Sequence, residues 1–303
     1  MIKIGGDNME VIKIDHITKD YGNHKGVFDV SFIINKGETV GFLGPNGSGK
    51  TTTIRQLMGF IQPDKGKVEI LGLDCFNQAH LVQKELGYLP GEIAFMEEMT
   101  GIEFIHFMAE LKGIKDLSKA NELMDFLELD AHGKIKRMSK GMKQKIGLVI
   151  AFMQDAPILI LDEPTSGLDP LMQNKFVELI KQAKKEGKTI LMSSHIFEEV
   201  EHTCDRVVMI KEGKIVTTET MEDLRKNRQK RYDIEFKEKV DARDFIKDYP
   251  QAKLLDNHVT LLLQGQTNDL LKQLSQYDIV DFNARSQSLE ELFLHYYGGG
   301  NHD

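Results

Sequence analysis

The sequence predicts an α/β protein built on a mixed sheet with an antiparallel β edge, followed by a small C-terminal α+β domain. Strand-like apolar segments alternate with helix-like amphipathic segments from Glu10 to Thr220, which is the pattern of a doubly wound sheet. The segment Pro157 to Leu161 carries no polar residue, as expected of a parallel strand that is buried on both faces. After Tyr232, shorter strands and helices alternate again and resemble a split βαβ plait.

Composition sets limits on size, compartment and partners. The 303 residues are 41% hydrophobic and 28% charged, enough for one large domain or two modest ones. A formal net charge of -8 excludes a global attraction to nucleic acid, so no nucleic-acid partner is expected. Two cysteines, Cys75 and Cys204, are too few for a disulfide framework, which favours a reducing cytoplasm. No apolar run approaches the roughly 18 residues of a membrane span, so another chain has to supply any spanning helices.

Changes in composition along the chain suggest five segments. A run of five cations between Arg225 and Arg231 could contact anionic headgroups or nucleic acid, but a solvated linker suits the acidic chain better. The C-terminal module has no His or Cys cluster and no glycine-rich loop, so its expected role is regulatory or structural. The expected segments are a leader at 1–8, a nucleotide-binding unit at 9–220 with a helical subdomain at about 92–154, a basic linker at 221–231, an α+β accessory domain at 232–298 and a tail at 299–303.

The elements of the N-terminal half follow from periodicity and turn residues. Isoleucines at Ile12, Ile14 and Ile17 mark the first strand. Alternating apolar residues from Phe28 to Ile34 mark a half-buried antiparallel strand, and Asn35 to Gly37 makes a turn. The expected elements are strands at 10–18, 27–34, 38–43, 66–73 and 86–90 and a helix at 52–59.

The rest of the chain is predicted in the same way. Residues 100–154 read as helical, with turns at Gly113 and Gly133. Further elements of the first unit are strands at 157–161 and 188–193, helices at 171–186 and 196–204, and a hairpin at 206–218. The second unit is expected to contain a strand at 232–236, a helix at 242–249, two strands meeting near 256–257, a helix at 268–277, a strand at 278–282 and a helix at 289–297.

A phosphate-binding loop stands at Gly44 to Thr51, where the sequence fits G-x-x-x-x-G-K-[ST] between a predicted strand and a predicted helix. Its glycines let successive backbone amides point at a phosphate, and the following helix adds the positive end of its dipole. Lys50 is then placed to reach the β- and γ-phosphates of a nucleotide, and the Thr51 hydroxyl to bind Mg²⁺.

Two acidic residues end the most apolar strand. Asp162 is placed to hold Mg²⁺ directly or through water. Glu163, one residue further, suits a carboxylate that orients and deprotonates an attacking water. A later strand ends at His195, and Ser166 to Pro170 lies between the two strand ends.

These ordered motifs resemble those of the nucleotide-binding subunit of an ABC transporter, over roughly Glu10 to Thr220. The resemblance implies the P-loop NTPase fold of an ABC cassette, with a mixed sheet core, an antiparallel β edge and a helical subdomain. It also implies roles for individual residues: nucleotide binding by Tyr21, which stacks on adenine, and by Asn46, Gly47, Ser48, Gly49, Lys50, Thr51 and Thr52; catalysis by Glu163 and the switch histidine His195; a signature contact to ATP on the opposite subunit by Ser139 and Gly141; a D-loop with Asp169; and Mg²⁺ binding by Thr51 and Asp162.

Two departures from the family pattern stand out. The signature reads Met138 to Met142, with Lys140 and Met142 in place of a glycine and a glutamine; Ser139, Gly141 and the helix start remain able to cradle a phosphate. Gly91 stands where the family usually has a glutamine that touches Mg²⁺, and Glu92 is the candidate replacement.

The resemblance further implies ATP and Mg²⁺ as cofactors and a head-to-tail dimer with itself or with a homologous cassette. Because a small C-terminal module follows the cassette, the chain is most similar to ATPase subunits of ABC-2 type exporters, the drug-efflux group. Such a chain is expected to hydrolyse ATP and power export through a separate integral membrane permease. Its expected location is cytoplasmic, peripheral on the inner face of the cell membrane. An apolar cluster follows Gly91; most of it is expected to be ordinary core and the rest to line a groove for a short cytoplasmic helix of the permease: Phe95, Met96, Met99, Phe104, Phe107 and Met108.

Three alternatives were weighed. A soluble ABC ATPase acting on ribosomes or nucleic acid usually has two cassettes or a long coiled coil, whereas this chain has one phosphate loop and no sustained heptads. A non-hydrolysing regulatory module is disfavoured by Glu163. A metal site on one helix face would use His195, Glu198, Glu199 and His202, but its histidines are seven residues apart.

Overall fold

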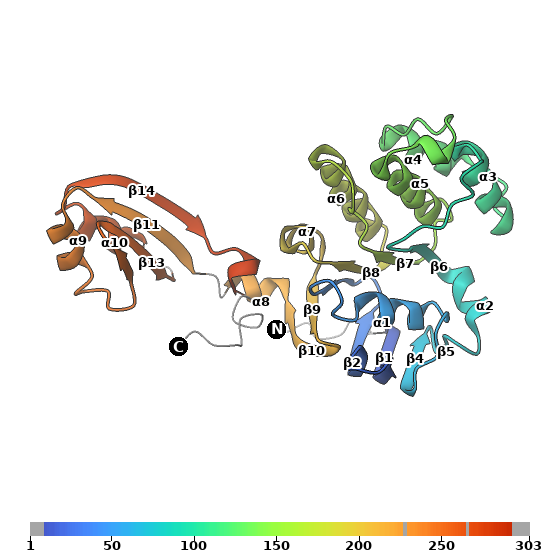
Figure 1. The fold of residues 1–303 in the computed structure, drawn as a ribbon, viewed down its shortest axis with the longest axis horizontal. Coiled ribbons are helices and arrows are strands. Elements are labelled where there is room, and N and C mark those ends of the chain that lie inside the picture. Colours follow the sequence, from blue (N-terminus) through green and yellow to red (C-terminus); the bar gives the residue numbers. More distant parts are fainter. Residues whose placement is uncertain (1–8, 227–228, 265–266, 293–303) are drawn as a thin grey trace, which may run out of the picture. The chain divides into compact units, whose positions relative to one another are not determined.

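The computed structural model describes residues 9–226, 229–264 and 267–292. The chain forms two compact units, Met1–Met221 and Glu222–Asp303, and each is described by itself (Figure 1). The predicted leader at 1–8, the tail at 299–303 and the end of the last predicted helix lie outside the described residues. Within the described residues, no helix has the length and apolar character needed to cross a bilayer.

The first unit is built on a six-stranded sheet with the order β10-β9-β3-β8-β7-β6. Five neighbouring strands run parallel, and β10 pairs antiparallel with β9 at the edge. β3, β7 and β8 are buried along their whole length, which explains their nearly continuous apolar sequences. The strands are β3 Thr39–Leu43, β6 Leu86–Leu89, β7 Ile158–Asp162, β8 Thr189–Ser194, β9 Arg206–Lys211 and β10 Lys214–Thr220.

A second, antiparallel sheet of this unit has the order β2-β1-β4-β5. Helix α1 (Lys50–Leu57) packs between the two sheets, with Ile54 and Leu57 fully buried in a core to which both sheets contribute. Across this core the rings of Phe32 and Phe42 lie 5.3 Å apart. The phosphate loop is thereby held between two sheets. The strands are β1 Glu10–Asp20, β2 Gly26–Asn35, β4 Lys65–Ile70 and β5 Leu73–Asp74.

Helices α3 to α5 form the predicted helical section (Figure 1), and side chains cap the starts of α3 and α5. Thr100 and Glu103 form a capping box at α3, and Ser139 caps α5. Asp169 caps α6, whose first residue is Pro170. After α1, the helices of the unit are α2 Ala79–Val82, η1 Gln83–Glu85, α3 Gly101–Leu111, α4 Ser118–Phe126, η2 Ile135–Arg137, α5 Lys140–Phe152, α6 Pro170–Lys185 and α7 Phe197–Thr203.

The second unit has four antiparallel strands in the order β12-β13-β11-β14, with helices α9 and α10 between strands. Its chain order, strand, helix, two strands, helix, strand, is that of a split βαβ plait. Aromatic rings fill its core, with Phe236 and Phe245 5.3 Å apart between centroids. The elements are β11 Lys230–Phe236, α9 Lys239–Phe245, β12 Lys253–Leu255, β13 His258–Leu263, α10 Thr267–Leu274 and β14 Ile279–Ser286.

Some element boundaries differ from those predicted. The segment 66–73 is two strands rather than one, because Leu71 and Gly72 have positive φ angles of 53° and 75° and make a tight turn. The segment 221–231 is not a plain linker: Met221–Lys226 is helix α8, and β11 begins at Lys230. Buried Met221 and Leu224 give α8 the apolar side that the cation-rich sequence obscures.

Candidate active site

The phosphate loop leads from β3 into α1 with the backbone that its glycines permit. Gly47 and Gly49 have φ angles of 78° and 112°, and a Cβ on Gly44 would lie 2.3 Å from the carbonyl oxygen of Ile210. The Lys50 ammonium group is buried and donates hydrogen bonds to the carbonyl oxygens of Gly44 at 2.7 Å and Pro45 at 3.2 Å. Lys50 therefore stabilises the loop by binding its carbonyl oxygens. A phosphate group would replace these oxygens as the acceptor.

Asp162 ends β7 and is fully buried. One carboxylate oxygen, Oδ1, accepts a hydrogen bond from the Ser193 hydroxyl. The other, Oδ2, is buried and has no hydrogen-bond partner in the part of the chain that the structure describes, although such oxygens are normally satisfied. A Cβ on Gly91 would lie 3.2 Å from Oδ2, so the glycine leaves the space beside it open. An unsatisfied buried carboxylate oxygen next to open space fits a Mg²⁺ ion or its bound water.

Glu163 joins the phosphate loop to the strand that ends at His195. Its Oε1 lies 3.3 Å from Nζ of Lys50, and its Oε2 lies 2.9 Å from Nδ1 of His195. Glu163 has a φ of 49°, an uncommon left-handed conformation for a residue with a side chain. Such conformations cost about 1 kcal/mol or more and gather at functional sites. The adjacent strand order β3-β8-β7 explains why three residues so distant in sequence meet at one edge.

Two serines before His195 fix the ends of the neighbouring strands, and the sequence did not reveal them. The Ser193 hydroxyl accepts a 3.0 Å hydrogen bond from the Glu163 amide. Ser194 accepts a 3.3 Å hydrogen bond from the Gly44 amide through its carbonyl oxygen. Gln144 was also missed; its side-chain amide donates to the carbonyl oxygens of Glu163 and Pro164. Polar residues at strand ends are the only sequence signal for the serines.

The signature residues lie against the D-loop of their own chain. Ser139 Oγ accepts the Met142 amide at 3.2 Å. A Cβ on Gly141 would lie 2.8 Å from the Gly167 carbonyl oxygen, so only glycine fits this approach without a shift. Lys140, which replaces a glycine of the family signature, donates a 2.9 Å hydrogen bond to Ser166 Oγ. This substitution thus ties the signature to the D-loop.

The remaining predicted ligands differ in exposure: Ser48 is buried and Gly49 and Thr52 are partly exposed, whereas the other ligands are exposed. Tyr21, the predicted adenine contact, lies after β1 with 53% of its surface accessible, as a stacking ring requires. Asn46, Gly47 and Thr51 are exposed in or beside the phosphate loop. Glu92 is also exposed, next to Gly91. Within the described part of the chain, no three His, Cys, Asp or Glu side chains are grouped as metal ligands, so the alternative metal site on α7 has no support.

An apolar groove of about 650 Å³ lies between the phosphate-loop core and the helical section. The rings of Phe60 and Tyr88, which both line it, are 5.9 Å apart. Of the predicted apolar cluster, Phe104 and Met108 line the groove, whereas Phe95 packs against the Phe104 ring. The lining also includes Lys84, Lys112 and His80, and none of the described lining residues is acidic.

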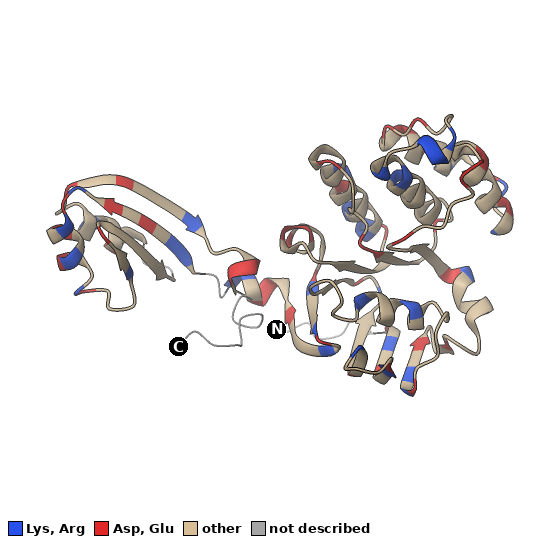
Figure 2. Cartoon of the chain, viewed as in Figure 1, with Lys and Arg blue, Asp and Glu red and all other residues tan. Residues whose placement is uncertain are grey.

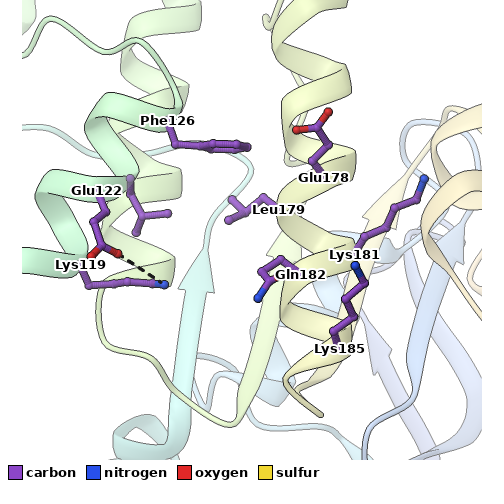
Figure 3. A pocket seen from close by; sticks show the side chains of 9 residues that line it. Lys119, Glu122, Phe126, Glu178, Leu179, Lys181, Gln182 and Lys185 are labelled. Carbon is purple, nitrogen blue, oxygen red and sulfur yellow. Dashed lines mark ion pairs between the residues drawn. The ribbon is translucent and has the colours of Figure 1, made fainter.

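A second pocket, of about 580 Å³, lies between α4 and α6 (Figure 3). Lys119 and Glu122 form an ion pair at 4.0 Å on one side of it. Phe126 and Leu179 face each other across it. It includes none of the predicted nucleotide-site residues, and we assign it no ligand.

The chain is similar to a family model, to known relatives and to solved structures. The family model described as "ABC transporter" matches residues 27–166. The bacitracin transport ATP-binding protein BcrA of Bacillus licheniformis is 32% identical over 96% of this chain and 98% of its own. The linearmycin resistance ATP-binding protein LnrL of Bacillus subtilis (strain 168) is 35% identical over 71% of this chain and 70% of its own. A solved structure, an ATP-binding subunit of an ABC transporter, has a TM-score of 0.66 at 30% identity, covering 71% of this chain and 92% of that one.

Proposed function

The chain belongs to the family of ABC transporter ATP-binding proteins, and we propose that it hydrolyses ATP to drive export through a separate membrane permease of the ABC-2 type. The observation that carries the ATPase proposal is the contact of Glu163 with both Lys50 and His195. The names of BcrA and LnrL, which refer to bacitracin transport and linearmycin resistance, support the exporter role.

Each residue of this group has a task in hydrolysis. Lys50 neutralises the β- and γ-phosphates once it leaves the carbonyl groups of the loop. Glu163 orients the attacking water and accepts its proton, and His195 holds both the γ-phosphate and the Glu163 carboxylate. Thr51 and Asp162 would hold Mg²⁺, which neutralises phosphate charge when bound; Glu92 is a candidate third ligand.

The signature motif supports a head-to-tail dimer of this chain with itself or with a homologous cassette. Ser139 and Gly141 stand at the start of the 13-residue helix α5, whose N-terminus attracts anions. Gly141 approaches Gly167 of the D-loop of its own chain closely. In the proposed dimer Ser139 and Gly141 bind the γ-phosphate on the opposite subunit with this helix end, with Asp169 at the contact between subunits.

The permease contact is proposed at the groove between the phosphate-loop core and the helical section. Its apolar lining, which includes Phe60, Tyr88 and Met108, suits the apolar face of a short cytoplasmic helix. Such a contact places the chain on the inner face of the membrane. A soluble role on ribosomes or nucleic acid is not favoured, since acidic and basic residues are interspersed in both units (Figure 2) and net charge is -8.

The test is to measure phosphate release from MgATP by the purified chain and, separately, to purify it from mild-detergent extracts of its native membranes. We expect slow hydrolysis that Lys50→Ala abolishes, and a polytopic membrane protein in stoichiometric amount. If neither the purified chain nor the material purified from membranes releases phosphate from MgATP, the ATPase proposal is wrong. Recovery with ribosomes, or alone in the soluble fraction, would refute the exporter role instead.

A further inference from the structure

A buried carboxyl group lies behind His195, and the proposed hydrolysis gives it no role. Glu199 is on α7 and only 7% of its surface is exposed. Its Oε2 accepts a hydrogen bond of 2.5 Å from the Ser194 hydroxyl. Its Oε1 is buried and accepts no hydrogen bond of good geometry among the described residues, although the Thr165 side chain lies close enough to lower its pKa. Burying a carboxyl group with one oxygen unsatisfied is unfavourable, so the position calls for an explanation.

The hydroxyl group that contacts Glu199 belongs to Ser194, and it also contacts the backbone on the other side of His195. Ser194 Oγ donates to Glu199 and accepts a 2.9 Å hydrogen bond from the amide of Ile196. With its proton committed to the carboxyl group, the hydroxyl presents a lone pair to that amide. The Ser194 carbonyl oxygen also accepts from the Gly44 amide at 3.3 Å. The Ser194 side chain therefore links the Glu199 carboxyl group to the backbone after His195, and the Ser194 carbonyl group links the backbone before His195 to the phosphate loop.

The same contact leads on to the reacting groups. Nδ1 of His195 is 2.9 Å from Oε2 of Glu163, whose other oxygen faces Lys50. A small pocket of about 170 Å³ lies beside these contacts, although Lys50 does not line it. Its lining includes Glu163, Ser166, Ser194, His195 and Glu199. Glu199 thus sits where the two strand ends and the D-loop meet.

We infer that Glu199 is a positioning residue for ATP hydrolysis: through Ser194 it fixes the backbone that carries His195 and so holds the imidazole against Glu163. The inference rests on the proposed ATPase function. Burial raises the pKa of Glu199 to about 7, so a neutral carboxyl group, or an amide of the same shape, suits this site. The contact requires a hydrogen-bond acceptor at this position and does not require a negative charge.

The test compares steady-state ATPase kinetics of the full chain and its variants. We expect E199A to lower kcat by about 10-fold or more, since misplaced catalytic groups cost rates of this order, with KM for MgATP changed less than about threefold. E199Q should recover kcat to within about threefold of the parent, because its amide oxygen still accepts from Ser194. S194A should match E199A, and the double variant should be no slower than either, since both substitutions break one contact.

Glu198 provides the matched control, because it lies on the same helix with an exposed carboxylate. E198A should retain the parental kcat. If the parent hydrolyses ATP but E199A keeps its kcat within about twofold, or loses activity only through KM, the inference is wrong. Should E199A fail to fold, S194A decides: parental kcat in S194A also overturns the inference. Failure of the parent to hydrolyse ATP is instead a failure of the proposed function.

Discussion

Nζ of Lys50 lies 3.3 Å from Oε1 of Glu163, although the two residues follow different strands of the sheet. The lysine is buried at 4% exposure and the glutamate partly exposed at 22%. A cation and an anion at this distance attract each other, and each offsets part of the other's desolvation. In the proposed mechanism, a nucleotide phosphate replaces the carboxylate as the partner of Lys50. Arrival of ATP would then free Glu163 to face the attacking water.

The first prediction concerns Glu163→Gln. The amide keeps the shape of the side chain but cannot accept a proton, so we expect hydrolysis to fall by about 100-fold or more. MgATP binding should persist, and the variant should sediment as a dimer in MgATP because the closed state is not resolved by hydrolysis. Analytical ultracentrifugation with and without MgATP measures this. A monomer in MgATP would argue against the homodimer and point to a different partner cassette.

Gly141→Ala tests the close contact between the signature and the D-loop. The added Cβ would meet the Gly167 carbonyl oxygen at 2.8 Å, so one of the two loops has to shift. We expect ATPase activity to fall by about 10-fold, because the contact orients the phosphate-binding helix end, while nucleotide affinity of the monomer is unchanged. Gly133→Ala is the matched control, since no atom lies within 4 Å of the Cβ it adds. Equal activity in the two variants contradicts the prediction.

The sequence was sufficient for motifs whose residues are contiguous. The phosphate loop at Gly44 to Thr51 can be recognised in the sequence because one short segment carries the glycines, the lysine and the hydroxyl group. Strand ends such as Asp162 could be predicted because an apolar run stops there. Contacts made by helix packing could not be predicted: Glu199 reaches Ser194 only because α7 folds back on β8.

The groove prediction shows the same limit. Apolar residues near Gly91 were visible in the sequence, but periodicity does not say which of them pack inside. The Phe95 ring packs against the Phe104 ring at a tilt, and Phe95 does not line the groove. Phe60 lines it from a distant part of the sequence. Assigning such a surface requires the packing of several helices, which local patterns do not determine.

The pKa of Glu199 predicts a pH dependence of stability. Burial raises this pKa from 4.5 to about 7 in the folded protein. Between these pH values the folded state binds more protons than the unfolded state, so stability falls as pH rises through the window and is then constant. The loss is on the order of 3 kcal/mol at most. E199Q cannot ionise, so between about pH 5 and about pH 8 its urea midpoint should fall less than that of the parent. Parallel pH profiles of the two proteins would contradict the raised pKa.

The last prediction concerns the proposed permease groove. Leu111→Glu places a carboxylate in the apolar lining, and because Leu111 is 66% exposed the fold should tolerate it. We expect co-purification with the permease to be lost and hydrolysis by the isolated chain to be unchanged.

Leu71→Glu makes the same chemical change at a 43% exposed position that does not line the groove, and it should leave the complex intact. If both variants still bind the permease, the docking surface lies elsewhere on the chain; if both fail, the added charge acts without regard to position. Loss in Leu111→Glu alone is the result that a docking groove requires, because only there does the new carboxylate have to be desolvated against an apolar helix.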